Sequence, residues 1–194
     1  MERNNTVTGV GLLLLLAIVL AGCSPYMAAV SLTTQAYGIA TDVRSVSTQA
    51  ADTAIEAQIK TALLTSPVSG TASIAVYCRQ GEVVLAGVLP RRAPAGFAAV
   101  QMARGTAGVR RVETFYVDAQ PDTVGDFALK TQIKTTLIAD PRLTAGQVDV
   151  GVYAGHVLLV GVVDSWQRVE DFREDVRSVS GVVSVRSYIQ VGAL

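Results

Sequence analysis

The sequence has few of the residues on which disulfide-bonded domains and nucleic-acid-binding proteins depend. Its 194 residues include two cysteines, one histidine and one tryptophan, and charged residues make up 16% of the chain. If Cys23 near the N-terminus is acylated, Cys78 has no partner, and a disulfide framework is excluded. Basic and acidic residues balance at 16 each, so no overall positive charge indicates a nucleic-acid partner.

Side chains suited to acid–base or metal chemistry are also scarce and scattered. His156 stands beside a predicted turn glycine where the first half of the chain has Glu82, which is typical of a solvated turn residue. No second histidine or pair of free cysteines is available to hold a metal. Gly105 and Gly108 follow a predicted helix instead of opening one, so they do not form a phosphate-binding loop. We therefore expect no enzymatic activity, no metal and no cofactor.

Two further residue types have bland interpretations. Cys78 continues an alternating apolar pattern with Ile74 and Val76, which predicts a small core residue and leaves a reactive thiol as the alternative. Acidic and basic residues alternate after Trp166 and predict the solvated face of a helix. The acidic members of that face are Glu170, Asp171, Glu174 and Asp175.

The N-terminus carries the apolar stretch LLLLLAIVLAGCSPY. The run from Val10 to Leu20 is about eleven residues, well short of the roughly twenty that a spanning helix needs. Its length fits the apolar region of a secretory signal peptide, predicted over residues 1–22. A short buried helix is the alternative. Leu20-Ala21-Gly22-Cys23 is similar to a bacterial lipobox, which implies that Cys23 is lipidated and becomes the first mature residue.

The rest of the chain is an internal duplication. Gln58-Ile59-Lys60-Thr61 recurs as Gln132-Ile133-Lys134-Thr135, and at the same offset GEVVLAGV (81–88) answers GHVLLVGV (155–162). A period in the seventies indicates two domains, here 52–117 and 126–194, and not a solenoid. The proline- and acid-containing segment 118–125 between them is the predicted linker.

Each repeat predicts the same order of elements. An apolar residue every fourth position gives a first helix, through Ile55, Ile59 and Leu63 or through Leu129, Ile133 and Leu137. Thr53 with Glu56 fits a capping box, and Asp126 is the corresponding N-cap candidate. Predicted strands follow at 73–78, 83–89 and 109–117, and at 148–152, 156–163 and 182–191, with a second helix before each last strand. Ser165 is expected to cap the second helix of repeat two.

This α-β-β-α-β unit is an α+β sandwich, with two helices on one face of a small three-stranded mixed sheet. The strand VLLVGVV (157–163) is apolar at every position, so both of its faces need cover. Helices cover one face only. We therefore expect the two sheets to face each other.

The strand–glycine signatures GEVVLAGVL and GHVLLVGVV, and the closing Gly-Val-x-x-Val pattern, resemble a pair of BON domains. With the lipobox and a polar tether over 23–51, the chain resembles the dual-BON outer-membrane lipoproteins of the DolP (YraP) family. The resemblance implies a non-enzymatic envelope-maintaining protein on the periplasmic face of the outer membrane that binds anionic phospholipid. It also implies a link to the outer-membrane protein assembly machinery and to division sites. Ser24, in place of aspartate, favours export to the outer membrane.

A membrane contact is predicted on the first helix of repeat two. With the apolar face inward, at about 100° per residue, a second side collects Phe127, Lys130, Lys134 and Ile138. Apolar groups between lysines suit an interface with anionic headgroups. The alternatives are that Phe127 is a staple and Ile138 belongs to the helix-end core. Trp166 is interpreted as the edge of the core, with a membrane anchor as the alternative. The competing function is a protein-binding adaptor for which lipid contact is incidental.

Overall fold

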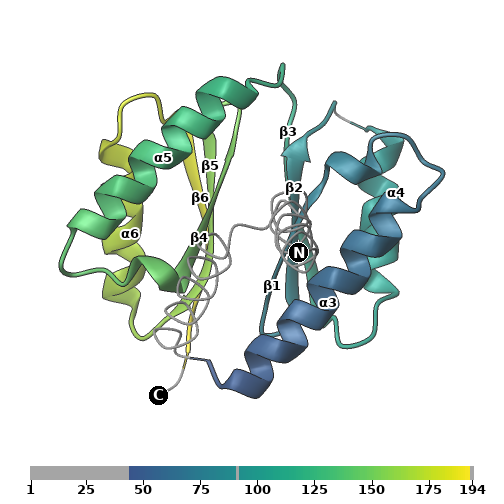
Figure 1. Cartoon of the computed structure of the whole chain (residues 1–194), viewed down its shortest axis with the longest axis horizontal. Helices are drawn as coiled ribbons and strands as arrows, with labels where there is room; N and C mark the ends of the chain where they lie inside the picture. Colours follow the sequence, from purple (N-terminus) through teal and green to yellow (C-terminus); the bar gives the residue numbers. More distant parts are fainter. Residues whose placement is uncertain (1–43, 91, 193–194) are drawn as a thin grey trace, which may run out of the picture. The chain divides into compact units, whose positions relative to one another are not determined.

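The structure is a computed structural model that describes residues 44–90 and 92–192, all within one compact unit, Thr41–Leu194. The predicted signal peptide, Cys23 and most of the predicted tether lie outside the described residues. Two domains of the predicted order follow one another along the chain (Figure 1).

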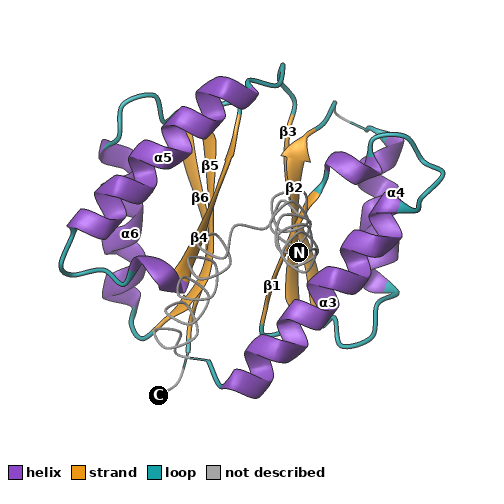
Figure 2. Ribbon diagram, viewed as in Figure 1, coloured by secondary structure: helices purple, strands orange, loops and turns teal. Residues whose placement is uncertain are grey.

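The first domain consists of α3 (Val46–Leu64), the 3₁₀ turn η1 (Thr71–Ser73), β1 (Ala75–Arg79), β2 (Glu82–Val88), α4 (Pro94–Arg104) and β3 (Arg111–Val117). The second consists of α5 (Thr123–Ala139), η2 (Ala145–Gln147), β4 (Val148–Tyr153), β5 (His156–Val163), α6 (Trp166–Ser178) and β6 (Ser184–Val191). In each sheet the middle strand pairs antiparallel with the strand before it and parallel with the strand after the helix. The predicted fold class is confirmed, with two helices against one face of each three-stranded mixed sheet (Figure 2).

Each domain has its own core between helices and sheet. The predicted helix faces are confirmed, since Ile59 and Ile133 are fully buried and Leu63 and Leu137 nearly so. Cys78 is fully buried in the first core, as expected for a small apolar residue. Phe172 of α6 is fully buried in the second core. The fully or almost fully buried apolar residues of α4 in the first core are the small Ala95, Ala99 and Ala103.

The predicted starts of the first helices are wrong. Ser45, not Thr53, caps α3, because its hydroxyl accepts a hydrogen bond from the Thr48 amide at 3.1 Å. The Thr53 hydroxyl donates to the Gln49 carbonyl within the helix. The helix therefore extends into the last residues of the predicted tether. In the second domain Asp122 is the N-cap and accepts from the Gly125 amide at 2.9 Å.

Asp52 and Asp126 have a different role, as clamps on the β-hairpins. The Asp126 carboxylate accepts hydrogen bonds from the amides of Ala154 and Gly155, at 2.7 and 2.9 Å. Asp52, which also pairs with Arg44, accepts in the same way from the first hairpin turn. Two consecutive turn residues have positive φ in each hairpin, +50° and +78° at Ala154 and Gly155. A carboxylate from the first helix thus holds both turn amides.

The two sheets face each other, as predicted. Their contact is a third buried cluster made of two residues from β2 and two from β5: Val84, Ala86, Leu158 and Val160. Four aromatic residues surround it: Tyr77, Phe115, Tyr153 and Tyr188. Phe115 meets Tyr153 edge-on, with ring centroids 6.0 Å apart. This cluster covers the second face of β5, which accounts for its uninterrupted apolar sequence.

Gly151 on β4 allows Tyr77 of the first domain to approach the second sheet. The Tyr77 and Tyr153 hydroxyls lie 3.0 Å apart within hydrogen-bonding distance. Burial raises the pKa of both phenols, and the hydrogen bond to Tyr153 partly offsets this for Tyr77. A Cβ atom at Gly151 would lie 2.8 Å from the Tyr77 hydroxyl and 2.9 Å from the Tyr153 ring. The lack of a side chain at Gly151 therefore makes room for the Tyr77 ring in the interface between the sheets.

Asp126→Ala is expected to lower the free energy of unfolding by about 2 kcal/mol, because two hydrogen bonds to a charged acceptor are lost. The matched control is Asp122→Ala, which removes only the cap of the same helix and is expected to cost about 1 kcal/mol. Urea unfolding measures both. A cost for Asp126→Ala no larger than that of the control would contradict the clamp.

Gly151→Ala is expected to lower the free energy of unfolding by about 1–3 kcal/mol, because the added methyl overpacks the interface. Gly87→Ala is the control, since a Cβ there meets its nearest atom at an ordinary 3.6 Å. Combining Gly151→Ala with Tyr77→Leu should recover part of the loss in a double-mutant cycle. Additive effects of the two substitutions would show that the space at Gly151 is not needed for the packing of Tyr77.

Candidate functional site

The predicted membrane-contact residues lie on α5, and we call Phe127, Lys130, Lys134 and Ile138 the α5 ridge. Phe127 is 74% exposed and Ile138 73% exposed, so neither is a staple nor a core residue. They are three turns apart, and at about 100° per residue they point within roughly 20° of each other. Lys134 is exposed and lies between them. An aromatic, a lysine and an isoleucine therefore follow one another along the outward side of the helix.

Lys130 is half-buried and sits at the side of this line. It helps to line a cavity of about 540 Å³ between α5 and the first domain, together with Phe127 and Asp126. Tyr77 and Val88 are among the residues of the opposite wall. Burial, and secondarily the neighbouring Lys134, lower the pKa of Lys130. The ridge therefore continues from an exposed helix face into a crevice beside the domain interface.

The same positions in the first repeat, Thr53, Glu56, Lys60 and Leu64, carry a different charge pattern. Glu56 replaces Lys130 and accepts a hydrogen bond from the Cys78 amide at 2.8 Å. It also pairs with Lys60 at 3.5 Å. On α5, by contrast, neither lysine pairs with a carboxylate in the part of the chain that the structure describes. The second repeat thus carries the cationic helix.

Two other exposed aromatic side chains lie off the ridge. Trp166, at the start of α6, is 71% exposed, so its interpretation as the edge of the core is wrong. Its i+3 neighbour Val169 is buried, but the indole itself turns to solvent. Phe97 on α4 is also 71% exposed. The three-residue spacing from Trp166 to the buried Val169 does not by itself show whether the indole packs inward or faces solvent.

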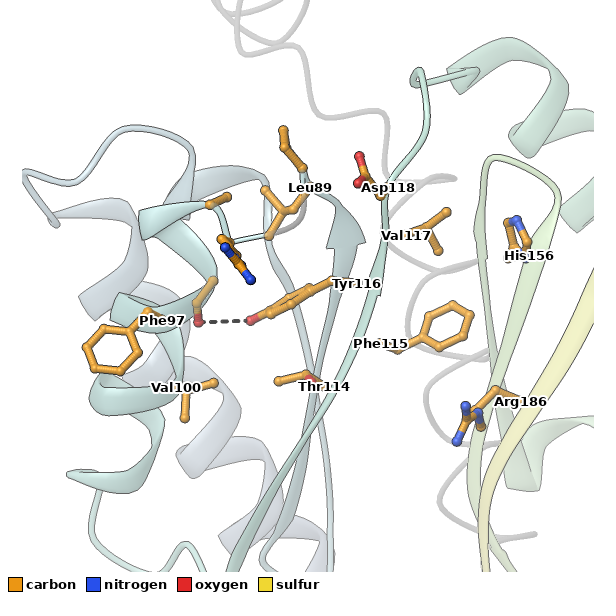
Figure 3. A pocket seen from close by; sticks show the side chains of 14 residues that line it. Leu89, Phe97, Val100, Thr114, Phe115, Tyr116, Val117, Asp118, His156 and Arg186 are labelled. Carbon is orange, nitrogen blue, oxygen red and sulfur yellow. Dashed lines mark hydrogen bonds between the residues drawn. The ribbon is translucent and has the colours of Figure 1, made fainter.

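Phe97 borders a groove of about 960 Å³ that sequence reasoning missed (Figure 3). Figure 3 shows that Tyr116 of β3 points toward α4, while Phe115 and Val117 point the opposite way, toward His156 and Arg186 of the second domain. The Tyr116 hydroxyl donates to the Gly96 carbonyl at 3.4 Å. Residues of both faces of one strand line a single groove, because it runs along the edge of the sheet.

No arrangement in the described residues supports catalysis. Burial, with Asp52 beside the thiol, raises the pKa of Cys78 to about 12, so the thiol stays protonated. His156 is within 2.8 Å of the Ser184 hydroxyl at a turn. No group of three or more metal-ligating side chains occurs in residues 44–90 and 92–192.

The acidic face of α6 is only partly solvated. Asp171 is buried, which corrects its predicted placement on the wet face, and it accepts from Gln167 at 3.1 Å. Arg142 lies among Asp171, Asp175 and Asp140, and its guanidinium holds the pKa of Asp140 down at about 2. These carboxylates are satisfied by an arginine and form a structural ion-pair cluster.

Among the helices that the structure describes, none has the length and apolarity to cross a membrane. The apolar run at Val10–Leu20 is outside those residues.

Comparison with known proteins agrees with this two-domain architecture. The model of the BON domain matches residues 51–115 and again residues 125–193. The chain is 34% identical over 142 residues to "Osmotically-inducible protein Y" of Escherichia coli (strain K12), a match that covers 70% of each chain. It is 28% identical over 156 residues to the "21 kDa hemolysin" of Actinobacillus pleuropneumoniae, covering 77% of this chain and 80% of that protein.

A solved structure of CdsD, a structural protein of the type III secretion system of Chlamydia trachomatis, is 13% identical with a TM-score of 0.32. That match covers 74% of this chain and 64% of the other, and the low TM-score carries no argument about function. The two family matches span more than half of the sequence and coincide with the two α-β-β-α-β units. The chain belongs to the BON-domain proteins and carries two BON domains in tandem.

Proposed function

We propose that this protein is an envelope lipoprotein whose α5 ridge binds anionic phospholipid on the periplasmic face of the outer membrane. Cys23 would carry the lipid, and the protein would help to maintain envelope integrity without enzymatic activity. The observation that supports this best is the exposure of Phe127 and Ile138 on either side of Lys134. Apolar side chains gathered on one exposed face and flanked by polar residues are typical of membrane interaction sites.

The energetics of this contact suit a weak, reversible site. A lysine near an anionic surface contributes about 1 kcal/mol, and burying one large apolar side chain contributes about 1.5–3 kcal/mol. Such a contact is weak for a freely diffusing protein. Confinement by a lipid anchor on the segment between Cys23 and α3 raises the effective concentration of the site and makes it sufficient. Local anionic lipid would then decide where the protein accumulates.

On this proposal the protein is a member of the DolP family of dual-BON lipoproteins. The tandem BON domains and the similarity to "Osmotically-inducible protein Y" support an association of this protein with the cell envelope. The lipobox-like sequence before Cys23 supports lipid anchoring. Mass spectrometry of the mature N-terminus tests this part, since an acylated Cys23 is expected and an unprocessed, unlipidated N-terminus would refute it.

The ridge is tested by flotation of the lipid-free chain, residues 24–194, with vesicles of phosphatidylglycerol or of phosphatidylcholine. The wild-type chain is expected to bind the anionic vesicles selectively and less at high salt, because surface charges are screened. Phe127→Ala should weaken binding more than tenfold, because about 1.5–3 kcal/mol of apolar burial is lost. Lys134→Glu should also weaken it more than tenfold, because it removes an attraction of about 1 kcal/mol and adds a repulsion.

Matched controls come from the repeat and from the other exposed aromatic. Lys60→Glu occupies the position on α3 that corresponds to Lys134, and Trp166→Ala removes a ring as exposed as Phe127. Neither control should change vesicle binding. Equal binding to both kinds of vesicle, with Phe127→Ala and Lys134→Glu unchanged, would reject the ridge and favour the adaptor function, in which the domains dock on the assembly machinery.

A further inference from the structure

β3 is an edge strand with one unprotected half. It pairs with β2 on one side and, among the described residues, has no strand on the other. Edge strands are protected in natural proteins by charges, prolines, bulges or cover. Arg111 and Glu113 place an ion pair on the first half of β3. The second half, Thr114–Val117, contains no charged residue and no proline.

The groove of Figure 3 follows this unprotected half. On the β2 side, the Val117 carbonyl accepts from the Leu89 amide at 2.9 Å. On the other side, the Thr114 carbonyl accepts from the Tyr188 hydroxyl at 3.2 Å. Since backbone groups of alternate residues point to opposite edges of a strand, the amide and carbonyl of Tyr116 face the groove. The floor of the groove is therefore polar backbone between apolar walls.

The rim of the groove has a definite charge. Arg92 and Arg186 line it from opposite domains, both are exposed, and neither pairs with a carboxylate within the described residues. Among the residues of 44–90 and 92–192 that line it, Asp118 alone is acidic. The exposed ring of Phe97 stands on the α4 side. A ligand with an extended backbone, apolar side chains and a carboxylate complements all three features.

We infer that this groove binds an extended acidic peptide segment of a partner protein, which pairs with Tyr116 as an added strand on β3. Strand addition supplies backbone hydrogen bonds, and pockets for alternate side chains give selectivity. A hydrocarbon chain suits the site less, because it would cover backbone donors and acceptors without satisfying them. The volume lies within the usual range of ligand sites. The site shares no residue with the α5 ridge, so it stands or falls separately from lipid binding.

The test uses the lipid-free chain, residues 24–194, and three fluorescein-labelled heptapeptides in anisotropy titrations. The acidic probe is Glu-Val-Thr-Val-Thr-Val-Thr, the second has lysine in place of glutamate, and the third is the acidic probe N-methylated at every valine and threonine, which blocks both edges of the strand. Saturable binding of the acidic probe is expected, at least tenfold weaker binding of the lysine probe, and none of the N-methylated probe. Bound acidic probe should also slow hydrogen exchange of the Tyr116 amide.

Two variant pairs locate the site. Phe97→Ser and Arg186→Glu should each weaken binding about tenfold. Trp166→Ser, at an equally exposed ring, and Arg177→Glu, on the outer side of α6, should leave it unchanged. Absence of saturable binding by the acidic probe, equal binding of its N-methylated form, or displacement by decanoate with no protection of Tyr116 would overturn the inference. The last result would assign the groove to an acyl chain.

Discussion

The contact between the two sheets is the constraint on which the rest of the structure depends. A three-stranded sheet with helices on one face leaves its other face in water, and β5 is apolar on both faces. Val84 and Ala86 meet Leu158 and Val160 across the interface and remove both sheet faces from solvent together. Neither domain is therefore complete alone, although each has its own helix–sheet core. The helices, and with them the α5 ridge, are left on the outer faces of the two layers.

The duplication explains how one fold carries two different surfaces. Glu56 and Lys130 are at equivalent positions of the two repeats. Glu56 accepts a hydrogen bond from the Cys78 amide and forms an ion pair with Lys60. Lys130, a donor only, makes no ion pair with a carboxylate in the described residues and lines a cavity. Apart from Asp52, the buried face of the first helix is apolar in both repeats, so the two repeats differ in charge on the outer side of this helix and not in its core residues. On α3 the lysine of this face is paired with a glutamate of the same helix, whereas on α5 the face carries two lysines.

The sequence allowed the architecture to be predicted because the repeat and the fourfold apolar spacing are local signals. The sheet–sheet contact was also predictable, since the run 157–163 has no polar face. The predicted helix starts were wrong because Thr53 and Glu56 fit a capping box, whereas the N-cap is Ser45, eight residues earlier, which has no Glu or Gln at the third position after it. The roles of Asp126 and Gly151 depend on atoms 28 and 74 residues away, such as the Ala154 amide and the Tyr77 hydroxyl. The groove at β3 required knowledge of which strand forms the edge.

The hairpin clamp has a mechanical consequence for the second domain. Asp126 binds the β4–β5 turn, and Phe127 is the next residue along α5. A force on the Phe127 ring is thereby transmitted through the Asp126 carboxylate to the turn that joins β4 to the central strand β5. The chain leads from the proposed anchor into the first domain, while this ring is on the second, so tension between them would pass through the contact between the two sheets and the connection from β3 to α5.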